Sequence, residues 1–300
     1  MIHAAGPFQG QDYAVAEACI DAGVHYVDLA DGRAFVCGIE ALDSRARGRG
    51  VLVVSGASTL PAVSSAVIDS LRAEFAEIGS LTAIEIGIAP AQRIPRGEAT
   101  LAGALSYCGK PFRRLEQGAW REVYGWQAIR RRRYRTLGTR WMAACDVPDL
   151  ELFPRRYHGV TTVRFDAGLE LAVLQWGLWL AAASARSGLV ADWSRHARRL
   201  QQLAALFDPF GSDVGGMHVA LAARLPDGRE RRVVWELVAR AGHGSEIPSI
   251  PAAIVARKLA AGAIAARGAM PCVGLFSLAE FAAAVAHLAI TWTVSATDAP

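Results

Sequence analysis

Residues 51–58, Val-Leu-Val-Val-Ser-Gly-Ala-Ser, carry the strongest indication of the fold class. Its first four residues form an apolar run without polar alternation, which is typical of a strand covered on both faces in a parallel sheet. The next residues, 55–58, end the strand, and Pro61 follows where a helix can begin without losing a hydrogen bond. We therefore expect a strand–loop–helix unit of an α/β fold.

The residues before this stretch alternate strand and helix in the same way. Apolar segments at 2–5 and 24–29 predict strands, and apolar residues at helical spacing predict helices over 12–22 and 34–47. Gly23 stands where the first of these helices ends. This alternation predicts a parallel sheet with crossover helices.

Beyond residue 80 the pattern changes to an α+β arrangement. The clearest element is a hairpin of residues 217–225 and 231–239, turned by Pro226-Asp227-Gly228 because Pro presets φ and Gly accepts a positive φ. Residues 83–88 alternate with period two, which predicts a strand with one face exposed. The remaining expected elements are a hairpin at 113–123, a strand at 160–165 and helices at 169–187, 192–207, 252–261 and 278–289.

Composition and charge exclude several classes of protein. With 300 residues, 52% of them apolar, the chain can bury a large core, so a disordered tail or a disulfide-stapled miniprotein is not expected. The net charge of +4 is nearly balanced and most basic residues are spread out, so we expect no nucleic-acid partner. Five cysteines without a CxxC pair predict no metal site and suit reduced thiols in a cytoplasm. The N-terminal residues do not resemble a signal peptide.

The most apolar segment spans residues 171–185 and contains no charge. It is short for a membrane span, which needs about 20 residues. We interpret it as a buried helix, and a helix that faces a membrane surface is the alternative. Trp176 and Trp179 lie on one face of this helix, which indicates first a core position or the interface of a homodimer.

Several ordered motifs resemble those of the saccharopine dehydrogenase family. Ala4-Ala5-Gly6-Pro7-Phe8 is similar to the A-x-G-P-F/Y loop that follows the family's fourth strand, and residues 23–31 to the G-x-x-Y-x-D segment of its fifth. Ser55-Gly56-Ala57-Ser58 with Pro61 is similar to the G-x-x-x-x-P turn after the sixth strand. Near the other end, residues 247–257 and 268–271 resemble the family's closing helix and G-V-x-P turn. The middle of the chain agrees only in overall layout.

The resemblance implies an NAD(P)-dependent oxidoreductase that transfers a hydride to or from a C–N or C–C double bond of a small-molecule substrate, with NADP or NAD as its cofactor. The implied fold is α/β, with a partial Rossmann-type parallel sheet in residues 1–80 and an α+β substrate or dimerisation domain in residues 81–246. Residues 247–300 then form C-terminal helices that return to the first domain. The alternative function is a non-catalytic scaffold or a membrane-surface interaction protein derived from this fold.

The resemblance also implies an N-terminal truncation. It places Met1 inside the fourth strand, and no G-x-G-x-x-G turn for a pyrophosphate occurs in the sequence. Two explanations remain, a start codon assigned too late and a remnant that does not bind the cofactor in the usual way. We favour the first, because a fragment with uncovered apolar faces would be unstable unless a partner chain covered them.

Three loops at the carboxyl edge of the expected sheet are candidates for cofactor binding, because open α/β sheets bind ligands there. An ordinary turn, helix capping and a plain polar loop are the respective alternatives. The candidate residues are Ala5, Gly6, Pro7 and Phe8 in the first loop, Asp28 and Asp31 in the second, and Ser55 and Gly56 in the third.

Two residues outside these loops are candidates for catalysis. Asp146 begins a run of three carboxylates that ends at Glu151, and carboxylates near arginines can recognise an amino-acid-like or acyl substrate, although solvated ion pairs are the commoner outcome. His243 lies in a glycine-flanked loop and is the better histidine for proton transfer, whereas His218 in the hairpin strand fits a satisfied sheet position. The arginine run 130–133 is a weak indication of contact with anionic lipid or nucleic acid.

Overall fold

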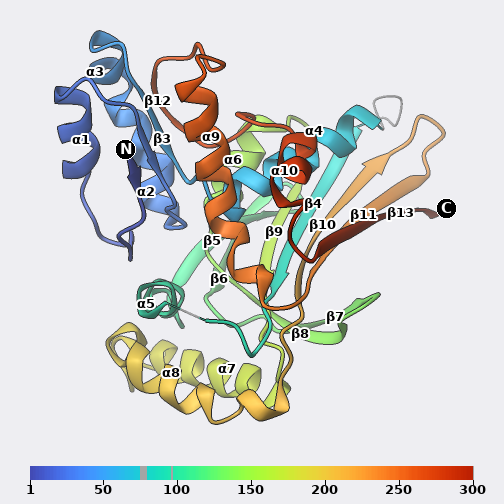
Figure 1. The fold of residues 1–300 in the computed structure, drawn as a ribbon. Helices are drawn as coiled ribbons and strands as arrows, with labels where there is room; N and C mark the ends of the chain where they lie inside the picture. The colour runs from blue at the N-terminus through green and yellow to red at the C-terminus, as the bar shows by residue number, and fades with distance from the viewer. Residues whose placement is uncertain (75–79, 96, 300) are drawn as a thin grey trace. The chain divides into compact units, whose positions relative to one another are not determined.

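The computed structural model describes residues 1–74, 80–95 and 97–299, which divide into two compact units. Unit 1 combines residues 1–73, 147–151 and 246–287, and unit 2 combines residues 74–146, 152–245 and 288–300. Figure 1 shows the course of the chain through these elements. Each unit is therefore built from segments that are distant in the sequence.

Unit 1 contains a four-stranded parallel sheet of order β1-β2-β3-β12. Its strands are β1 (Ile2–His3), β2 (Tyr26–Asp28), β3 (Leu52–Ser55) and β12 (Gly268–Pro271). All four residues of β3 are buried, as the apolar run predicts. Helices associated with this unit are α1 (Ala14–Asp21), α2 (Arg33–Gly38), α3 (Asp43–Gly48), α4 (Ser64–Glu74), α9 (Ile250–Ala260) and α10 (Leu278–Val285).

The core of unit 1 forms between this sheet and its helices. Ile20 of α1 and Val53 of β3 are fully buried in one cluster with the ring of Tyr26. Burying an aliphatic side chain of this size contributes about 1.5–3 kcal/mol each. Apolar residues at helical spacing on α1 thus meet the continuous apolar run of β3, and this explains why both were recognisable in the sequence.

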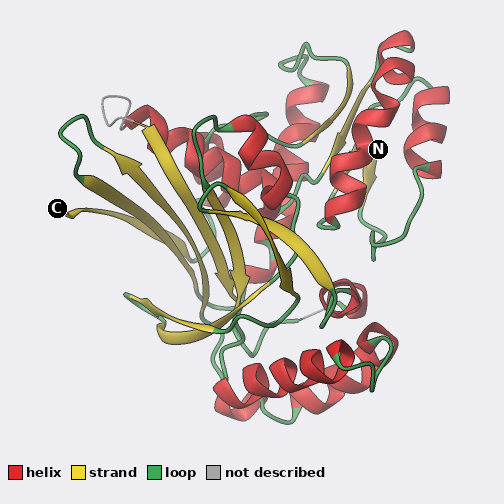
Figure 2. Cartoon of the chain, turned by 180° about the vertical axis from the view of Figure 1, so that it is seen from behind, coloured by secondary structure: helices red, strands yellow, loops and turns green. Residues whose placement is uncertain are grey.

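Unit 2 contains a seven-stranded mixed sheet of order β13-β11-β10-β4-β9-β8-β7, seen from behind in Figure 2. Its strands are β4 (Ser80–Ala89), β7 (Arg130–Tyr134), β8 (Gly138–Ala144), β9 (Thr162–Ala167), β10 (Gly215–Arg224), β11 (Glu230–Ala239) and β13 (Ile290–Ala299). A separate hairpin consists of β5 (Pro111–Glu116) and β6 (Ala119–Tyr124). The helices are α5 (Glu98–Ser106), α7 (Ala172–Arg186) and α8 (Ala197–Ala205), and α6 (Asp149–Arg156) runs through the boundary of the units.

The two faces of the large sheet differ in polarity. One face carries buried apolar side chains such as Ile86, Val219 and Trp235. On the other, cross-strand register places His218 of β10 beside Glu236 of β11 and opposite Gly87 of β4, which in turn faces Asp166 of β9. Strand periodicity of two therefore collects the polar residues of four strands on a single face.

The fold class expected from the sequence, a parallel sheet with a second α+β part, is confirmed. The structure departs from the expected elements at the tail. Residues 290–299 were expected beyond the last helix of a purely helical tail, but they form β13, which pairs along its whole length with β11. Alternating threonines and apolar residues in this segment suit a sheet edge.

Two further departures concern the middle of the chain. The arginine run 130–133 is β7 of a hairpin with β8 and was not predicted as a strand. Asp149 and Glu151 lie in α6, a helix that was not predicted from the sequence. The face of β4 expected to be exposed instead carries partly buried ion pairs, because Arg130 and Arg232 reach the Glu85 side chain on it.

Candidate functional site

The carboxyl edge of the unit 1 sheet is organised by Asp28, the last residue of β2. One carboxylate oxygen, Oδ1, accepts hydrogen bonds from the Ser55 hydroxyl at 3.0 Å, the Gly56 amide at 2.8 Å and the Ala30 amide at 2.9 Å. Burial raises the pKa of Asp28, and these hydrogen bonds oppose that effect. Asp28 thereby fixes two of the predicted loops to each other, so three predicted residues, Asp28, Ser55 and Gly56, are brought together.

Gly56 is required at this edge for two reasons. Its φ is +78°, a backbone conformation that favours glycine. A Cβ atom there would also lie 2.8 Å from Pro61 Cδ and 3.0 Å from Val36 Cγ1. Gly56 thus serves the close packing of the loop, and its amide is already used by Asp28.

The first predicted loop presents main chain to solvent around a cis Gly6-Pro7 peptide. The Gln11 side-chain amide donates to the carbonyl oxygens of Ala5 at 2.9 Å and Pro7 at 2.8 Å and so fixes the loop. Phe8 is buried, and its ring packs against those of His3 and Phe35. Phe8 is therefore an anchor in the core, while Ala5 and Pro7 are exposed.

Asp31 is the predicted residue that offers a carboxylate to solvent at this edge. Its side chain is exposed and accepts a hydrogen bond at 3.0 Å from the Gln9 side-chain amide. The contact connects the second loop to the first. A carboxylate in this setting can accept hydrogen bonds from hydroxyl groups such as those of a ribose.

These loops fit part of a nicotinamide dinucleotide. Asp31 supplies an exposed carboxylate as an acceptor for ribose hydroxyl groups, whereas Oδ1 of Asp28 is already engaged by three donors of the protein itself. The glycine-rich turn that would hold the pyrophosphate on a helix N-terminus does not occur in the sequence. The fit is therefore to the nicotinamide and ribose half of the cofactor.

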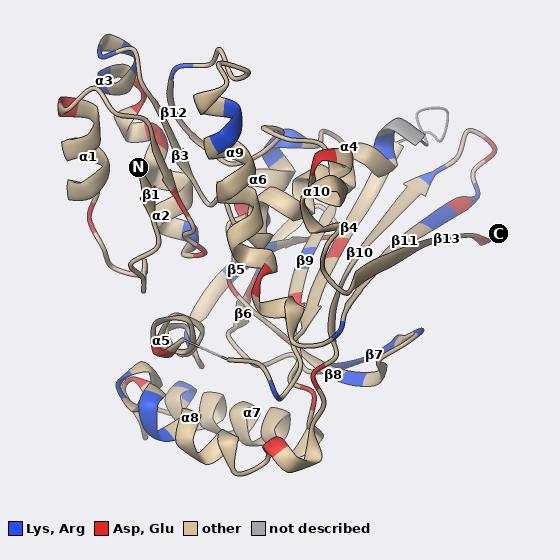
Figure 3. Ribbon diagram, in the orientation of Figure 1, with Lys and Arg blue, Asp and Glu red and all other residues tan. Residues whose placement is uncertain are grey.

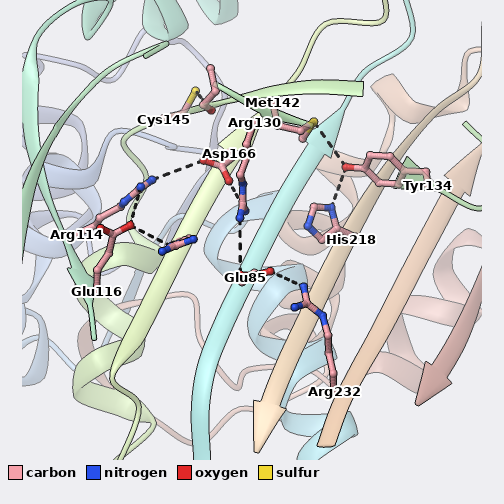
Figure 4. A network of polar contacts seen from close by, with 12 residues as sticks. Glu85, Arg114, Glu116, Arg130, Tyr134, Met142, Cys145, Asp166, His218 and Arg232 are labelled. Carbon is pink, nitrogen blue, oxygen red and sulfur yellow. Dashed lines mark hydrogen bonds and ion pairs between the residues drawn. The ribbon is translucent and has the colours of Figure 1, made fainter. Parts of the chain in front are cut away.

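Unit 2 holds a second polar centre, drawn in Figure 4, on the face of its sheet that carries Glu85, Asp166 and His218. We call this side of the sheet the charged face. Asp166 forms ion pairs with Arg130 and, at 3.7 Å, with Arg114. Glu85 pairs with Arg232 at 2.6 Å and with Arg130 at 3.7 Å. Burial raises the pKa of Glu85, but the two arginines outweigh it and lower the pKa overall. Arg130 thus connects two carboxylates of neighbouring strands.

His218 lies on the same face and is completely enclosed. Its Nδ1 atom is 2.8 Å from the Tyr134 hydroxyl, and its Nε2 atom is buried without a hydrogen-bond partner in the described part of the chain. Burial and the nearby Arg132 lower the pKa of His218 well below its usual value, so the ring is neutral. A Cβ atom on Gly87 would lie 2.3 Å from His218 Cε1, so Gly87 makes the room for the ring.

The charged face has more donors than acceptors. Besides His218 Nε2, the Nε atoms of three arginines are buried without a partner among the described residues, while the carboxylates of this face are engaged in ion pairs. Such a surplus of buried donors suits a ligand that carries a carboxylate or another oxyanion. The three arginines are Arg114, Arg132 and Arg140, whereas Arg164 Nε lies 3.0 Å from Glu116 Oε1.

The two predicted catalytic residues lie in unit 2, apart in sequence and on different elements. His243 begins a short 3-10 helix and is half-buried, and its Nδ1 atom accepts a hydrogen bond of 2.8 Å from the Ala289 amide. This contact leaves the proton of the neutral ring on Nε2. Asp146 is half-buried just after β8.

Sequence reasoning missed the most unusual carboxylate in the acidic run. Asp149 is fully buried in unit 1 and accepts a hydrogen bond of 2.5 Å from the Ser64 hydroxyl. Burial raises its pKa to about 7. Its neighbour Glu151 forms an ordinary ion pair with Arg33 at 3.1 Å. The signal available in the sequence was the position of Asp149 after Pro148, where a helix begins.

Among the described residues no group of three or more histidines, cysteines or acids is placed to hold a metal ion. The five cysteines are all free thiols. Burial raises the pKa of Cys108 to about 12, which makes it an inert thiol. Neither a metal ion nor a reactive thiol is therefore added to the polar groups around Asp28 or on the charged face of unit 2.

Comparison with solved structures finds a similar fold. The chain is similar to apo saccharopine dehydrogenase (L-Glu forming) from Saccharomyces cerevisiae, with a TM-score of 0.61 and 10% identity over 94% of this chain and 82% of that chain. Dehydrogenases from Clostridium difficile and Chromobacterium violaceum give TM-scores of 0.29 and 0.31 and identities of 8% and 11%, over 80% of this chain and 59% and 56% of theirs. These two scores are too low to indicate a shared fold.

No protein-family model matches the chain, and no curated protein sequence does. The similarity to the yeast enzyme therefore concerns the fold alone. The chain has a fold that oxidoreductases use.

Proposed function

We propose that the protein is an NAD(P)-dependent oxidoreductase of the saccharopine dehydrogenase type, which transfers a hydride to or from a C–N or C–C double bond. The observation that carries this proposal is the arrangement around Asp28, which fixes the loops at the carboxyl edge of the parallel sheet and leaves Asp31 open to solvent. The fold similarity to a dehydrogenase supports it. Ligands of open α/β sheets bind at this edge.

The cofactor, when bound, supplies the hydride, and the protein supplies orientation and electrostatics. Asp31 accepts hydrogen bonds from ribose hydroxyls, and the exposed main chain at Ala5, Gly6 and Pro7 contacts the nicotinamide end. Asp28, Ser55 and Gly56 act indirectly, because their hydrogen bonds to one another fix the loops. Phe8 positions the first loop through its buried ring.

We further propose that the substrate carries a carboxylate or another oxyanion, which the unpartnered guanidinium donors in unit 2 bind. Their surplus over the carboxylates of the charged face supports this class of substrate. His243, whose Nδ1 atom accepts a hydrogen bond from the Ala289 amide, is proposed to serve in proton transfer. Asp146 is proposed to orient an amine or hydroxyl group of the substrate.

Titration of the folded chain with NADH and with NADPH, followed by nicotinamide fluorescence and by thermal shift, tests the proposal. We expect saturable binding, and Asp31→Asn weakens it by about tenfold because a hydrogen bond to a charged group is lost. Glu40→Gln is the matched control, since Glu40 is an exposed acid of the same unit outside the three loops, and it leaves the affinity unchanged.

A folded chain that binds neither nucleotide overturns the oxidoreductase proposal and favours a non-catalytic scaffold. Equal effects of Asp31→Asn and Glu40→Gln overturn the assignment of Asp31. The comparison of NADH with NADPH in the same titration determines which of the two nucleotides is preferred.

A further inference from the structure

Exposed apolar side chains are concentrated on one part of unit 2. Seven of the thirteen large apolar side chains that are exposed among the described residues lie between positions 173 and 210. Leu189, Leu206 and Phe210 are among the most exposed of them, at 81%, 70% and 76%. This density is unusual, because single exposed apolar residues are normal on a protein surface but contiguous groups mark interaction sites.

Helix α7 contributes a continuous strip to this surface. Val173, Trp176 and Leu180 recur at intervals of three and four residues and are exposed at 59%, 37% and 62%. Gln175 and Ala182 are buried and mark the opposite face of the helix. The helix is therefore amphipathic, and its apolar strip stays exposed at all three positions.

Aromatic stacking joins this strip to the arginine run. The Arg131 guanidinium lies over the Trp141 ring at 5.5 Å. The Trp141 ring packs on Trp176 at 5.3 Å, and Trp176 packs on Trp179 at 5.7 Å. Tryptophan rings and arginines are both enriched where proteins meet the membrane interface.

The charges around the strip are predominantly positive. Arg133, Arg198 and Arg199 are exposed and have no carboxylate partner among the described residues. The two acids between positions 172 and 210 are already engaged, Asp192 by the Ser194 amide and hydroxyl and Asp208 by the Gln92 side chain. Figure 3 displays the arginines of α8 in blue.

We propose that α7 and α8 bind the surface of an anionic lipid membrane through exposed apolar side chains such as Trp176, Leu180 and Leu206 and through the exposed arginines Arg131, Arg198 and Arg199. Apolar side chains enter the interface while arginines contact anionic headgroups. None of the helices in the described ranges is long and apolar enough to cross a bilayer. A second copy of the chain fits less well, because a two-fold interface would oppose the same unpaired arginines.

Flotation of the full chain with vesicles tests this surface directly. The probes are vesicles of phosphatidylcholine alone and vesicles of an equimolar mixture with phosphatidylglycerol. We expect binding to the anionic vesicles that is at least about tenfold tighter than to the neutral ones and that weakens with added salt. Equal binding to both vesicles, or binding to neither, overturns the proposal.

Two pairs of variants with matched controls locate the contact. Trp176→Ser with Leu180→Ser lowers the affinity by about tenfold or more, whereas Trp120→Ser with Val294→Ser leaves it unchanged. The control residues are similarly exposed, at 42% and 44%, and Trp120 also has an arginine over its ring. Thermal denaturation confirms that each variant is folded.

A second pair of variants tests the contribution of the arginines. Arg198→Glu with Arg199→Glu lowers binding to anionic vesicles by about tenfold or more, and Arg121→Glu with Arg224→Glu on other exposed strand positions does not. Equal effects of test and control pairs overturn the assignment of the surface. A stable dimer that Leu180→Ser dissociates, without vesicle binding, replaces the membrane with a second copy. Because no nucleotide is involved, this result is independent of the oxidoreductase proposal.

Discussion

Asp28 in the parallel sheet and Asp166 in the mixed sheet are both buried aspartates, but their partners differ in kind. Asp28 is surrounded by neutral donors, two backbone amides and a hydroxyl, which belong to the loops of its own edge. Asp166 is surrounded by the guanidinium groups of Arg130 and Arg114. The Asp28 carboxylate fixes the loops of its own edge, whereas the Asp166 carboxylate neutralises arginines of other strands.

The largest effect is expected from Asp166→Asn. The substitution leaves Arg114 and Arg130 with one carboxylate fewer on a largely buried face, and breaking a buried pair in this way costs about 3–5 kcal/mol of unfolding free energy. Urea denaturation monitored by tryptophan fluorescence measures it. The double variant Asp166→Asn with Arg130→Gln recovers part of the loss. A cost below about 1 kcal/mol for the single variant would contradict the role of charge here.

Asp149 is a third buried aspartate, and it differs from Asp28 and Asp166 because its side-chain partner among the described residues is a single hydroxyl, that of Ser64. Its folded pKa of about 7 lies above the ordinary value of 3.8, so the protonated form is favoured in the folded state. Its stabilising contribution is complete below about pH 4 and is lost as the pH rises to about 7, by up to about 4 kcal/mol.

We therefore expect Asp149→Asn to flatten the pH dependence of stability and to stabilise the protein above pH 7, since asparagine has the same shape and no charge. Urea denaturation at a series of pH values measures this. Glu151→Gln is the control, because Glu151 is partly exposed and ion-paired. An unchanged pH profile in the Asp149→Asn protein would show that another group dominates.

Gly87→Ala is expected to have an intermediate effect on the mixed sheet. The new Cβ would lie 2.3 Å from His218 Cε1, and overpacking of this kind costs about 1–3 kcal/mol. Because Tyr134 holds the imidazole, the ring cannot move aside freely. His218→Ala in the same chain relieves the clash, so a double-mutant cycle with a coupling energy near zero would refute this explanation.

The smallest effect is expected from Asp28→Asn. The amide oxygen still accepts from Ser55, Gly56 and Ala30, and no cation loses its partner, so the cost is about 1 kcal/mol. Thermal denaturation of Asp28→Asn beside Asp166→Asn gives the contrast directly. Equal costs for the two variants would remove the distinction between neutral and charged partners.

The parallel sheet was predictable because its signals are local. Residues 51–54 are an apolar run and residues 24–29 are a mostly apolar segment, both beside glycines, and such segments indicate burial without reference to distant parts of the chain. The turn at Pro226-Asp227-Gly228 is equally local, and both of its strands formed as expected. Asp28 was predicted as a site residue from its place at the end of a strand. Its role in fixing the loops also depends on β3, because its partners Ser55 and Gly56 lie at the end of that strand.

The charged face was not predictable in the same way. Arg130 and Arg132 are partly buried and alternate with the exposed Arg131 and Arg133, as in a strand. The sequence does not reveal this alternation, because all four residues are arginines. Their partners Asp166 and Glu236 are far away in the sequence, so only the fold could match them. The raised pKa of Asp149 likewise results from burial among residues that are distant in sequence, such as Ser64.

The interleaved composition of the two units has a consequence for the order of folding during synthesis. The parallel sheet begins with β1 but is completed by β12, and the mixed sheet begins with β4 but is completed by β13 at its edge. Strand pairing over such separations is slow, because loop-closure entropy must be overcome first. Neither unit can be finished on the ribosome until nearly all of these residues have emerged, so the nascent chain carries unpaired strand edges for most of its synthesis.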